Sequence, residues 1–332
     1  MEVLEAGHSA HVIDSLANSS VESLARIRTL TGCDFGFTKA DLRSASAVRK
    51  VLRAFEPDVV IHFAGLKAVG ESALDPLGYY SCNVSGTIEL LQALRESRCR
   101  RFVFSSSATV YGDPEYLPLD EGHRLAPTSP YGRTKLHLED ILRDMAASDP
   151  SWSIALLRYF NPVGAHPSGR IGEDPKGTPN NLVPFIAQVA VGQRPALRVF
   201  GDDYETPDGT GVRDYIHVQD IARAHLAAIN WTERERGCEA FNLGTGRGFS
   251  VLEVLRAMEG ASGRDIPFEI APRRAGDVAA YFANSDRASS VLGWRPELTL
   301  EDMCSSVWRW QCENPTGYRP QMQRKRRVAL RG

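Results

Sequence analysis

The sequence predicts an α/β fold in which a doubly wound parallel sheet is joined to a smaller, loop-rich α/β lobe. In the first half of the chain, short apolar runs rich in β-branched residues alternate with longer segments of helical periodicity, which is typical of a parallel sheet covered by helices. From about residue 161 this alternation weakens, and proline and glycine are dense over 161–181 and again over 201–211. We therefore expect a second lobe that covers the ligand edge of the sheet.

Four segments are expected to form strands of the sheet, and polar residues or glycine gather where they end. They are residues 11–14, 58–65, 101–107 and 154–159. Between them, residues 83–97 and 131–147 carry apolar side chains at helical spacing. Parallel sheets bind ligands beyond the carboxyl ends of their strands, so the polar strand ends predict a ligand site there.

Residues 213–245 return to compact strand and helix patterns and are expected to rejoin the first lobe. The predicted first lobe is therefore 1–160 with 213–245, and the predicted second lobe is 161–212 with 246–320. A basic tail follows over 321–332 and contains the one run of like charges, residues 324–327. A run of this kind at a chain end favours a solvated tail over a docking surface.

The composition favours a small-molecule ligand. The 332 residues have a formal net charge of −2, with 42% hydrophobic and 24% charged residues, which is ordinary for a globular protein. Because no basic field surrounds the chain, a nucleic acid partner is not expected. No apolar run reaches the roughly 18 residues of a membrane-spanning helix, and the first residues lack the order of a signal peptide, so we expect no membrane partner.

The six cysteines indicate neither a disulfide scaffold nor a metal site. No two of them have C-x-x-C spacing, and no histidine cluster accompanies them. We therefore expect reduced thiols, a cytoplasmic location and no bound metal.

The strongest local signal for chemistry is Tyr131 followed by Lys135, because residues four apart on a helix lie on one face. A tyrosine hydroxyl is a poor base near neutral pH, but an adjacent ammonium and a cationic nicotinamide ring would favour the phenolate. Ser107, at the end of a predicted strand, would face the same reacting oxygen. A Tyr-x-x-x-Lys pair is common by chance and a serine at a strand end is often a cap, so the order of strand, serine and helix is what favours catalysis.

These residues lie in longer runs in which the chain resembles the UDP-glucose 4-epimerases, also called UDP-galactose 4-epimerases. They are a family of extended short-chain dehydrogenases/reductases, and the resemblance extends from about residue 7 to about residue 320. The runs are HFAGLKAVGES at 62–72, FSSSATVYG at 104–112, SPYG at 129–132, WSIALLRYFNPVGAH at 152–166, GTGVRDYIH at 209–217 and APRRAGD at 271–277.

The resemblance implies a Rossmann-like, NAD-binding first lobe, a UDP-sugar-binding second lobe and a homodimer packed through helices of the first lobe. The implied reaction interconverts UDP-glucose and UDP-galactose by oxidation at C4, rotation of the 4-keto sugar and re-reduction. In it Tyr131 would be the base, Lys135 would hold the nicotinamide ribose and tune Tyr131, and Ser107 would contact the 4-oxygen of the sugar.

The resemblance also implies two sets of binding residues. The NAD-binding residues would be Asp14, Asn18, Ser19, Asp41, Leu42, Phe63, Ala64, Gly65, Lys67 and Phe160, with Tyr131 and Lys135. The UDP-sugar-binding residues would be Asn161, Asn181, Leu182, Phe200, Arg213, Arg274, Asp277 and Tyr281, with Ser107. The acid at Asp14 favours NAD over NADP because its charge repels a 2′-phosphate. The bulk of Tyr281 favours UDP-glucose and UDP-galactose over their N-acetyl forms.

The chain departs from the family's pattern before residue 11. A dinucleotide-binding sheet opens with a strand and a G-x-x-G-x-x-G turn that binds the pyrophosphate, yet the one early glycine here is Gly7. Met1–Ala6 resembles the end of the family's first helix. We therefore expect a sheet without its central first strand, and a chain that is unstable, binds NAD poorly, or both. Ser15 and Cys82 stand where the family usually has asparagine.

Two other interpretations stay open at this point. The chain could be another nucleotide-sugar epimerase or a dehydratase. Dehydratases of this fold, however, need an Asp-Glu pair at the place where residues 108–110 read Ala-Thr-Val. A catalytically silent binding protein that has kept the fold is the other. A third idea, a nucleic-acid binder with a basic tail, lacks a basic groove or an aromatic platform in the sequence.

Overall fold

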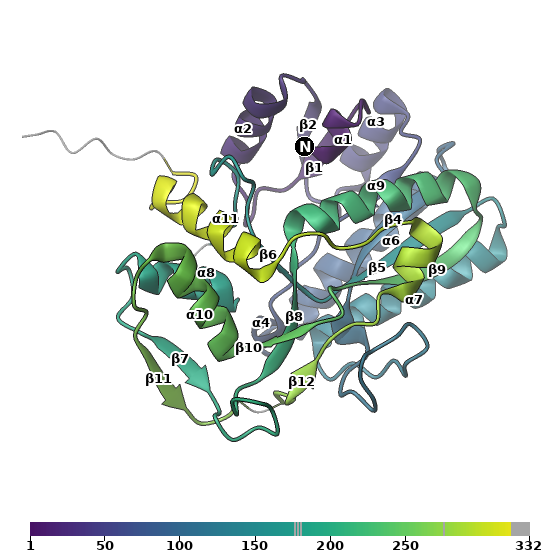
Figure 1. Cartoon of the computed structure of the whole chain (residues 1–332). Coiled ribbons are helices and arrows are strands. Elements are labelled where there is room, and N and C mark those ends of the chain that lie inside the picture. The colour runs from purple at the N-terminus through teal and green to yellow at the C-terminus, as the bar shows by residue number, and fades with distance from the viewer. Residues whose placement is uncertain (176, 178, 180, 275, 320–332) are drawn as a thin grey trace, which may run out of the picture.

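The computed structural model describes residues 1–175, 177, 179, 181–274 and 276–319, and the predicted basic tail at 321–332 lies outside them. The main sheet has four parallel strands in the order β3-β4-β5-β9 (Figure 1). Its strands are β3 (Val60–His62), β4 (Arg101–Ser107), β5 (Ser153–Tyr159) and β9 (Gly237–Leu243). The predicted parallel α/β fold is therefore confirmed.

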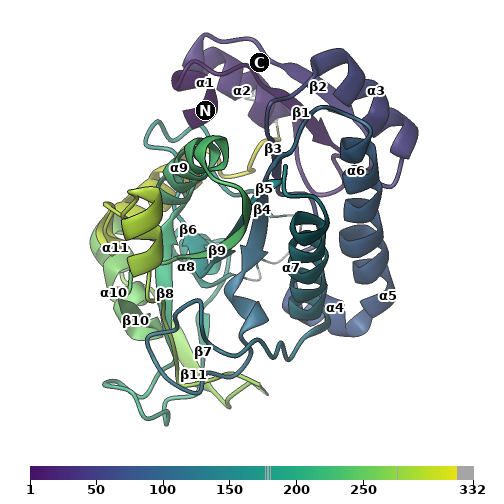
Figure 2. The ribbon, with the colours of Figure 1, turned by 90° about the vertical axis from the view of Figure 1, so that its right-hand side faces the viewer.

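Both faces of the main sheet are covered by helices because both faces of its strands are apolar. Phe102 and Phe104 of β4 pack with Leu138 and Leu142 of one layer, whereas Val103, between the two phenylalanines, packs with residues of α9 on the other face. Figure 2 shows α6 and α7 side by side on the first face, with α9 across the sheet. The helices of this lobe are α3 (Ala45–Phe55), α6 (Gly86–Arg95), α7 (Pro130–Ser148) and α9 (Val218–Arg234), with the short α4 (Val69–Leu74) and α5 (Pro76–Tyr79), a π-helical turn η1 (Tyr80–Ser85) and a 3₁₀ turn η2 (Ala108–Val110).

The predicted elements agree with the structure at their centres and differ at their ends. Residues 11–14 and 101–107 are strands with the predicted bounds. The predicted strand over 58–65 is shorter, because only residues 60–62 pair with β4, and Phe63 lies outside the sheet with 57% of its surface exposed. The predicted helix over 83–97 begins as η1 and continues as α6.

A second, smaller parallel sheet pairs β1 (His11–Asp14) with β2 (Gly36–Lys39). In the described part of the chain β1 and β3 belong to separate sheets. The small sheet packs on α1 (Glu2–Glu5) and α2 (Val21–Thr31) around its own buried residues, Leu4, Leu24 and Phe35.

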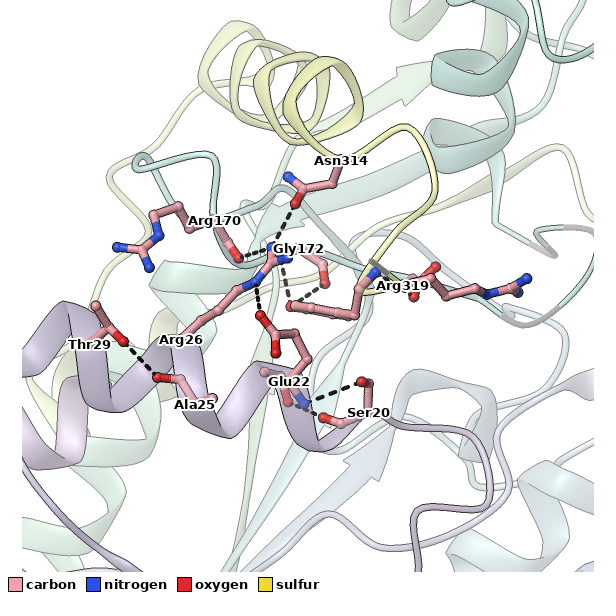
Figure 3. A network of polar contacts seen from close by, with 12 residues as sticks. Ser20, Glu22, Ala25, Arg26, Thr29, Arg170, Gly172, Asn314 and Arg319 are labelled. Carbon is pink, nitrogen blue, oxygen red and sulfur yellow. Dashed lines mark hydrogen bonds and ion pairs between the residues drawn. The ribbon is translucent and has the colours of Figure 1, made fainter. Parts of the chain in front are cut away.

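Arg26 of α2 joins this small sheet to the other lobe. Its guanidinium donates hydrogen bonds to the carbonyl oxygen of Arg170 at 3.0 Å and to Oδ1 of Asn314 at 2.6 Å (Figure 3). It also lies over the rings of Tyr318 and Trp310. The Arg26 side chain is mostly shielded from water, and the carboxylate of Glu22, one helical turn away, compensates its positive charge.

The second lobe has its own core, formed mainly by three helices. These are α8 (Leu182–Ala190), α10 (Val251–Ser262) and α11 (Leu300–Glu313). Its strands are β6 (Asn161–Val163), β7 (Leu197–Phe200), β8 (Val212–His217), β10 (Gly248–Ser250), β11 (Phe268–Ala271) and β12 (Ala280–Tyr281). Residues of the π-helical turn η3 (Ala288–Leu292), together with Trp294, pack instead in the α9 layer of the first lobe, although the predicted boundaries place them in the second. No helix within the described residues is long and apolar enough to cross a membrane.

Candidate active site

The carboxyl end of β4 and the start of α7 bring Ser107, Tyr131 and Lys135 together. Ser129 caps α7 by accepting a hydrogen bond from the Gly132 amide, and Pro130 occupies the first turn, where its missing N–H costs nothing. The amide of Tyr131 donates to the Ser72 hydroxyl at 3.1 Å. These contacts fix Tyr131 at the first turn of the helix, as the sequence predicts.

Lys135 is buried at the centre of the site. Its ammonium donates a 2.6 Å hydrogen bond to the carbonyl oxygen of Ser105 and lies 4.8 Å from the ring centre of Phe104 and 5.9 Å from that of Tyr131. Burial lowers the pKa of Lys135 to about 8, and the charge of Glu139 opposes that shift. Lys135 therefore titrates close to the pH at which an enzyme works.

Tyr131 is also buried, and burial raises the pKa of its phenol, whereas its hydrogen bond with Ser107 opposes that rise. Burial is the larger of these two effects, so the hydrogen bond with Ser107 does not by itself lower the pKa of the phenol. The Ser107 hydroxyl accepts from the amide and hydroxyl of Thr109, at 3.2 and 3.0 Å, which holds it at the start of the 3₁₀ turn.

Tyr281, from the second lobe, closes over this end of the sheet. Its hydroxyl donates a 2.6 Å hydrogen bond to the carbonyl oxygen of Ala108, and its ring lies 5.7 Å from that of buried Phe160. Asn161 follows Phe160 as the first residue of β6. Two predicted substrate residues therefore lie beside the group around Tyr131.

A further set of predicted UDP-sugar residues gathers on the second lobe. Arg213 is the register partner of Tyr281, donates to the Val278 carbonyl at 2.9 Å and lies 3.5 Å from the Asp277 carboxylate. The guanidinium of Arg274 lies 3.8 Å from the ring centre of Phe200. The two remaining members of the set, Asn181 and Leu182, form the N-cap and first residue of α8.

The predicted adenosine-binding residues form a separate group on the small sheet. One oxygen of Asp14, Oδ1, accepts from the Ser19 hydroxyl at 2.8 Å and from the Leu16 amide at 2.6 Å. Asn18 is exposed. The carboxylate of Asp41 pairs with Arg43 at 2.7 Å, and Leu42 packs against the core of the main sheet. Of the two departures from the family's pattern, Ser15 is exposed and Cys82 is partly buried.

The remaining predicted cofactor residues follow β3. Phe63 and Ala64 are exposed, so they offer an open surface to a flat ring. Gly65 has φ of +157°, and a Cβ there would lie 3.0 Å from Oδ1 of Asn83. The Lys67 ammonium lies 3.4 Å from the Glu173 carboxylate. The residues present therefore fit a dinucleotide. Asp14 supplies an acid for the adenosine ribose, and the exposed Phe63 and Ala64, next to Gly65, supply an open surface for the nicotinamide end.

Several residues of the site could not be identified from the sequence pattern. Asn83 accepts from the Leu66 amide at 2.7 Å and donates to the Leu66 carbonyl and to the Thr134 hydroxyl. Ser72 receives the Tyr131 amide, and Glu139 lies one turn beyond Lys135. A buried polar residue on an otherwise apolar helical face is the signal that could have found Asn83 and Glu139.

Among the residues described, no group of three or more histidine, cysteine, aspartate or glutamate side chains could hold a metal ion. The six cysteines are free.

A serine and a Tyr-x-x-x-Lys pair at the carboxyl ends of a helix-covered parallel sheet define an enzyme of the short-chain dehydrogenase/reductase class. The model of the NAD dependent epimerase/dehydratase family matches residues 1–244. The chain is 52% identical over 325 residues to UDP-glucose 4-epimerase of Mus musculus, with 96% of this chain and 94% of that protein covered. It is 53% identical over 319 residues to UDP-glucose 4-epimerase of Bacillus subtilis (strain 168), with 96% and 94% covered.

The solved structures agree with these relatives. UDP-glucose 4-epimerase from Bifidobacterium longum, crystallised with NAD+ and UDP, matches with a TM-score of 0.92 and 50% identity, over 95% of this chain and 94% of that one. The enzyme from Stenotrophomonas maltophila, with bound NAD and formylated UDP-arabinopyranose, matches with a TM-score of 0.93 and 48% identity, over 95% and 94%. The chain belongs to the UDP-glucose 4-epimerase family. The predicted family and fold class are confirmed, and with them the isomerase class and NAD as the family's cofactor.

Proposed function

We propose that this chain interconverts UDP-glucose and UDP-galactose. The observation that carries the proposal is the convergence of Ser107, Tyr131 and Lys135 with Tyr281 of the second lobe, in a chain of the epimerase family. Neither a dehydratase nor a silent binding protein is favoured, because residues 108–110 hold no acid pair and the three catalytic side chains are intact.

The roles of the three side chains follow from their chemistry. When bound, NAD+ would supply the hydride acceptor for oxidation at C4 of the sugar, and its reduced form the hydride for re-reduction. The Tyr131 oxygen would remove the proton of the 4-hydroxyl and give it back, and the Ser107 hydroxyl would orient that oxygen by a hydrogen bond. The Lys135 cation would favour the phenolate form of Tyr131. The Asp14 carboxylate would bind the adenosine ribose, with Asn18, Ser19, Asp41 and Leu42 around it.

The substrate would be held by its UDP part, so that the sugar is free to turn. Arg213 and Arg274 supply cations for the diphosphate, which a guanidinium binds through two oxygens at once. Phe200 offers a ring for the uracil, and Asn161, Asn181, Leu182 and Asp277 complete the group. Tyr281 limits the space around the sugar, which supports UDP-glucose and UDP-galactose as substrates.

A homodimer and a cytoplasmic location belong to the same proposal. Leu74 and Leu77 of α4 and α5 are 88% and 80% exposed, a large apolar exposure on two neighbouring helices of the first lobe. A second copy of the chain would cover them. Light scattering of wild type and a Leu74→Lys/Leu77→Lys variant tests this, since only the variant should be a monomer. The free thiols suit a reducing compartment.

The test of the reaction is an assay of UDP-galactose conversion with NAD supplied in excess. We expect UDP-glucose as product, and a loss of about 10²- to 10⁴-fold in kcat for Tyr131→Phe. UDP binding without conversion in folded wild-type protein would instead favour the silent binding protein.

A further inference from the structure

A buried ion pair lies behind the site, between Glu139 of α7 and Arg158 of β5. Both side chains are almost fully enclosed, with 0% and 1% of their surface exposed. Arg158 donates to both carboxylate oxygens, at 2.9 and 2.6 Å, in the two-pronged geometry that makes such pairs strong. Buried ion pairs do not generally add stability over apolar residues, so this one invites a functional explanation.

The pair touches every element that carries a proposed catalytic side chain. Glu139 lies one helical turn beyond Lys135 on α7. It accepts a 2.6 Å hydrogen bond from Ser106, the neighbour of Ser107 on β4. Arg158 is the register partner of Ser106 and precedes Tyr159 and Phe160. Through these bonds the ends of β4 and β5 are fixed against the helix of Tyr131.

A second set of contacts holds Arg158 from its far side. Its guanidinium donates to the Tyr111 hydroxyl at 2.9 Å, and that hydroxyl donates to Oδ1 of Asn242 on β9 at 2.6 Å. The Glu139 carboxylate also receives a 2.7 Å hydrogen bond from Arg143, which is partly exposed. The Glu139 carboxylate thus accepts four hydrogen bonds from three residues, two from Arg158 and one each from Ser106 and Arg143.

We propose that Glu139 is a positioning residue for the epimerase reaction: it orders the strand ends that present Ser107 and Phe160, and its charge keeps Lys135 a cation. The inference rests on the proposed roles of Ser107, Tyr131 and Lys135. Glu139 touches none of the reacting atoms and acts through its neighbours.

Among the groups that face Lys135, Glu139 supplies the negative charge that favours its cationic form. These groups are Tyr131 and Glu139 on its own helix, His62 on β3, and the Ser105 carbonyl and Phe104 ring on β4. Burial lowers the pKa of Lys135, and Glu139 is the carboxylate that opposes this. Although burial acts to raise the pKa of Glu139, its bonds with Arg158 and Ser106 lower it, so Glu139 stays ionised.

The test measures the ionisation of Lys135 directly, by NMR of full-length protein labelled with ¹⁵N-lysine, with a Lys135→Met variant to identify the signal. In Glu139→Gln the titration midpoint should fall by about one pH unit or more. The matched control is Asp140→Asn, which removes the same charge from the next position of the same helix, where the carboxylate is 62% exposed. It should leave the midpoint unchanged.

Two further variants keep the test decisive. Glu139→Gln/Arg158→Gln removes both charges and replaces the single variant if that one fails to fold. Glu139→Asp keeps the charge and shortens the side chain, so the Lys135 midpoint should return towards wild type. Its kcat should nevertheless stay at least about tenfold below wild type, with KM for UDP-galactose unchanged, because displaced strand ends misplace the reacting groups.

The outcomes separate this inference from the proposed function. An unchanged Lys135 midpoint in folded Glu139→Gln, or equal midpoints in Arg158→Gln and in the double variant, overturns the electrostatic role. Wild-type kcat in both Glu139→Gln and Glu139→Asp overturns the positioning role. A wild-type chain that converts no UDP-galactose would contradict the proposed function, while the NMR titration would still decide whether Glu139 controls Lys135.

Discussion

The hydroxyl of Tyr281 donates a 2.6 Å hydrogen bond to the carbonyl oxygen of Ala108, the residue that follows Ser107. This bond joins β12 of the second lobe to the 3₁₀ turn after β4 of the first. It also holds the tyrosine ring beside Phe160, at the end of the sheet where the sugar is proposed to turn.

Replacing Tyr281 should therefore change substrate choice. We expect Tyr281→Ser to raise the turnover of UDP-N-acetylglucosamine relative to UDP-galactose by about tenfold or more, since it removes the ring that limits the space. The ratio of the two kcat/KM values measures this effect. Tyr281→Phe keeps the ring and loses the hydrogen bond, so it should cost about 1 kcal/mol of stability without changing the ratio. An equal rise in both variants would show that the hydrogen bond, rather than side-chain size, limits the substrate.

Arg26 should matter for stability because its two interlobe hydrogen bonds and two aromatic contacts are partly shielded from water. We expect Arg26→Ala to lower the free energy of unfolding by about 2 kcal/mol, measured by urea denaturation. Arg26→Lys should fall between wild type and the alanine variant, because an ammonium lacks the planar guanidinium whose Nε binds Glu22 while its Nη1 binds the two interlobe acceptors. Arg49→Ala is the control, since Arg49 pairs with the half-exposed Glu96 and should contribute less than about 1 kcal/mol. Equal effects of Arg26→Ala and Arg49→Ala would contradict a special role for the interlobe contacts.

His62 should make the protein sensitive to acid. Its side chain is buried against Thr87, and burial, aided by the Lys135 charge, lowers its pKa to about 3 from an ordinary 6.5. Between these values the unfolded chain binds more protons than the folded one, so stability is lost as the pH falls below 6.5. Lowering the pH from 7 to 5 should cost about 2 kcal/mol through this residue alone.

Urea unfolding at pH 7 and pH 5 checks the prediction on His62. His62→Gln cannot take up the proton and should lose about 2 kcal/mol less than wild type between the two pH values. The exposed His8 serves as the control position, and His8→Gln should behave like wild type. The same loss in His62→Gln and wild type would place the acid sensitivity elsewhere.

The sequence predicts best those elements whose apolar side chains repeat regularly. The strand at 101–107 and the helix over 131–147 follow from such patterns, and so does the position of Tyr131 at the start of that helix. The end of β3 does not, because Phe63 is as apolar as a sheet residue and nevertheless lies outside the sheet.

Polar contacts between residues far apart in the chain could not be predicted from the sequence pattern. Arg26 and Asn314 are 288 positions apart, and nothing local to either residue indicates the other. Glu139 and Arg158 lie on different elements, and only the packing of α7 on β4 and β5 reveals that the two side chains pair with each other. The approach of Tyr281 to Ala108 likewise depends on how the two lobes meet.

The small β1–β2 sheet, with α1 and α2 and the three buried apolar residues Leu4, Leu24 and Phe35, should behave as a separate cooperative unit. In native-state hydrogen exchange, we expect the amides of β2 to exchange through a partial opening of lower free energy than the amides of β4. Equal protection of both strands would contradict this. Asp14 ends β1, and Ser19 of the following loop donates a hydrogen bond to it. A dinucleotide bound there would therefore suppress the opening, and its measured affinity would include the free energy needed to keep the small sheet folded.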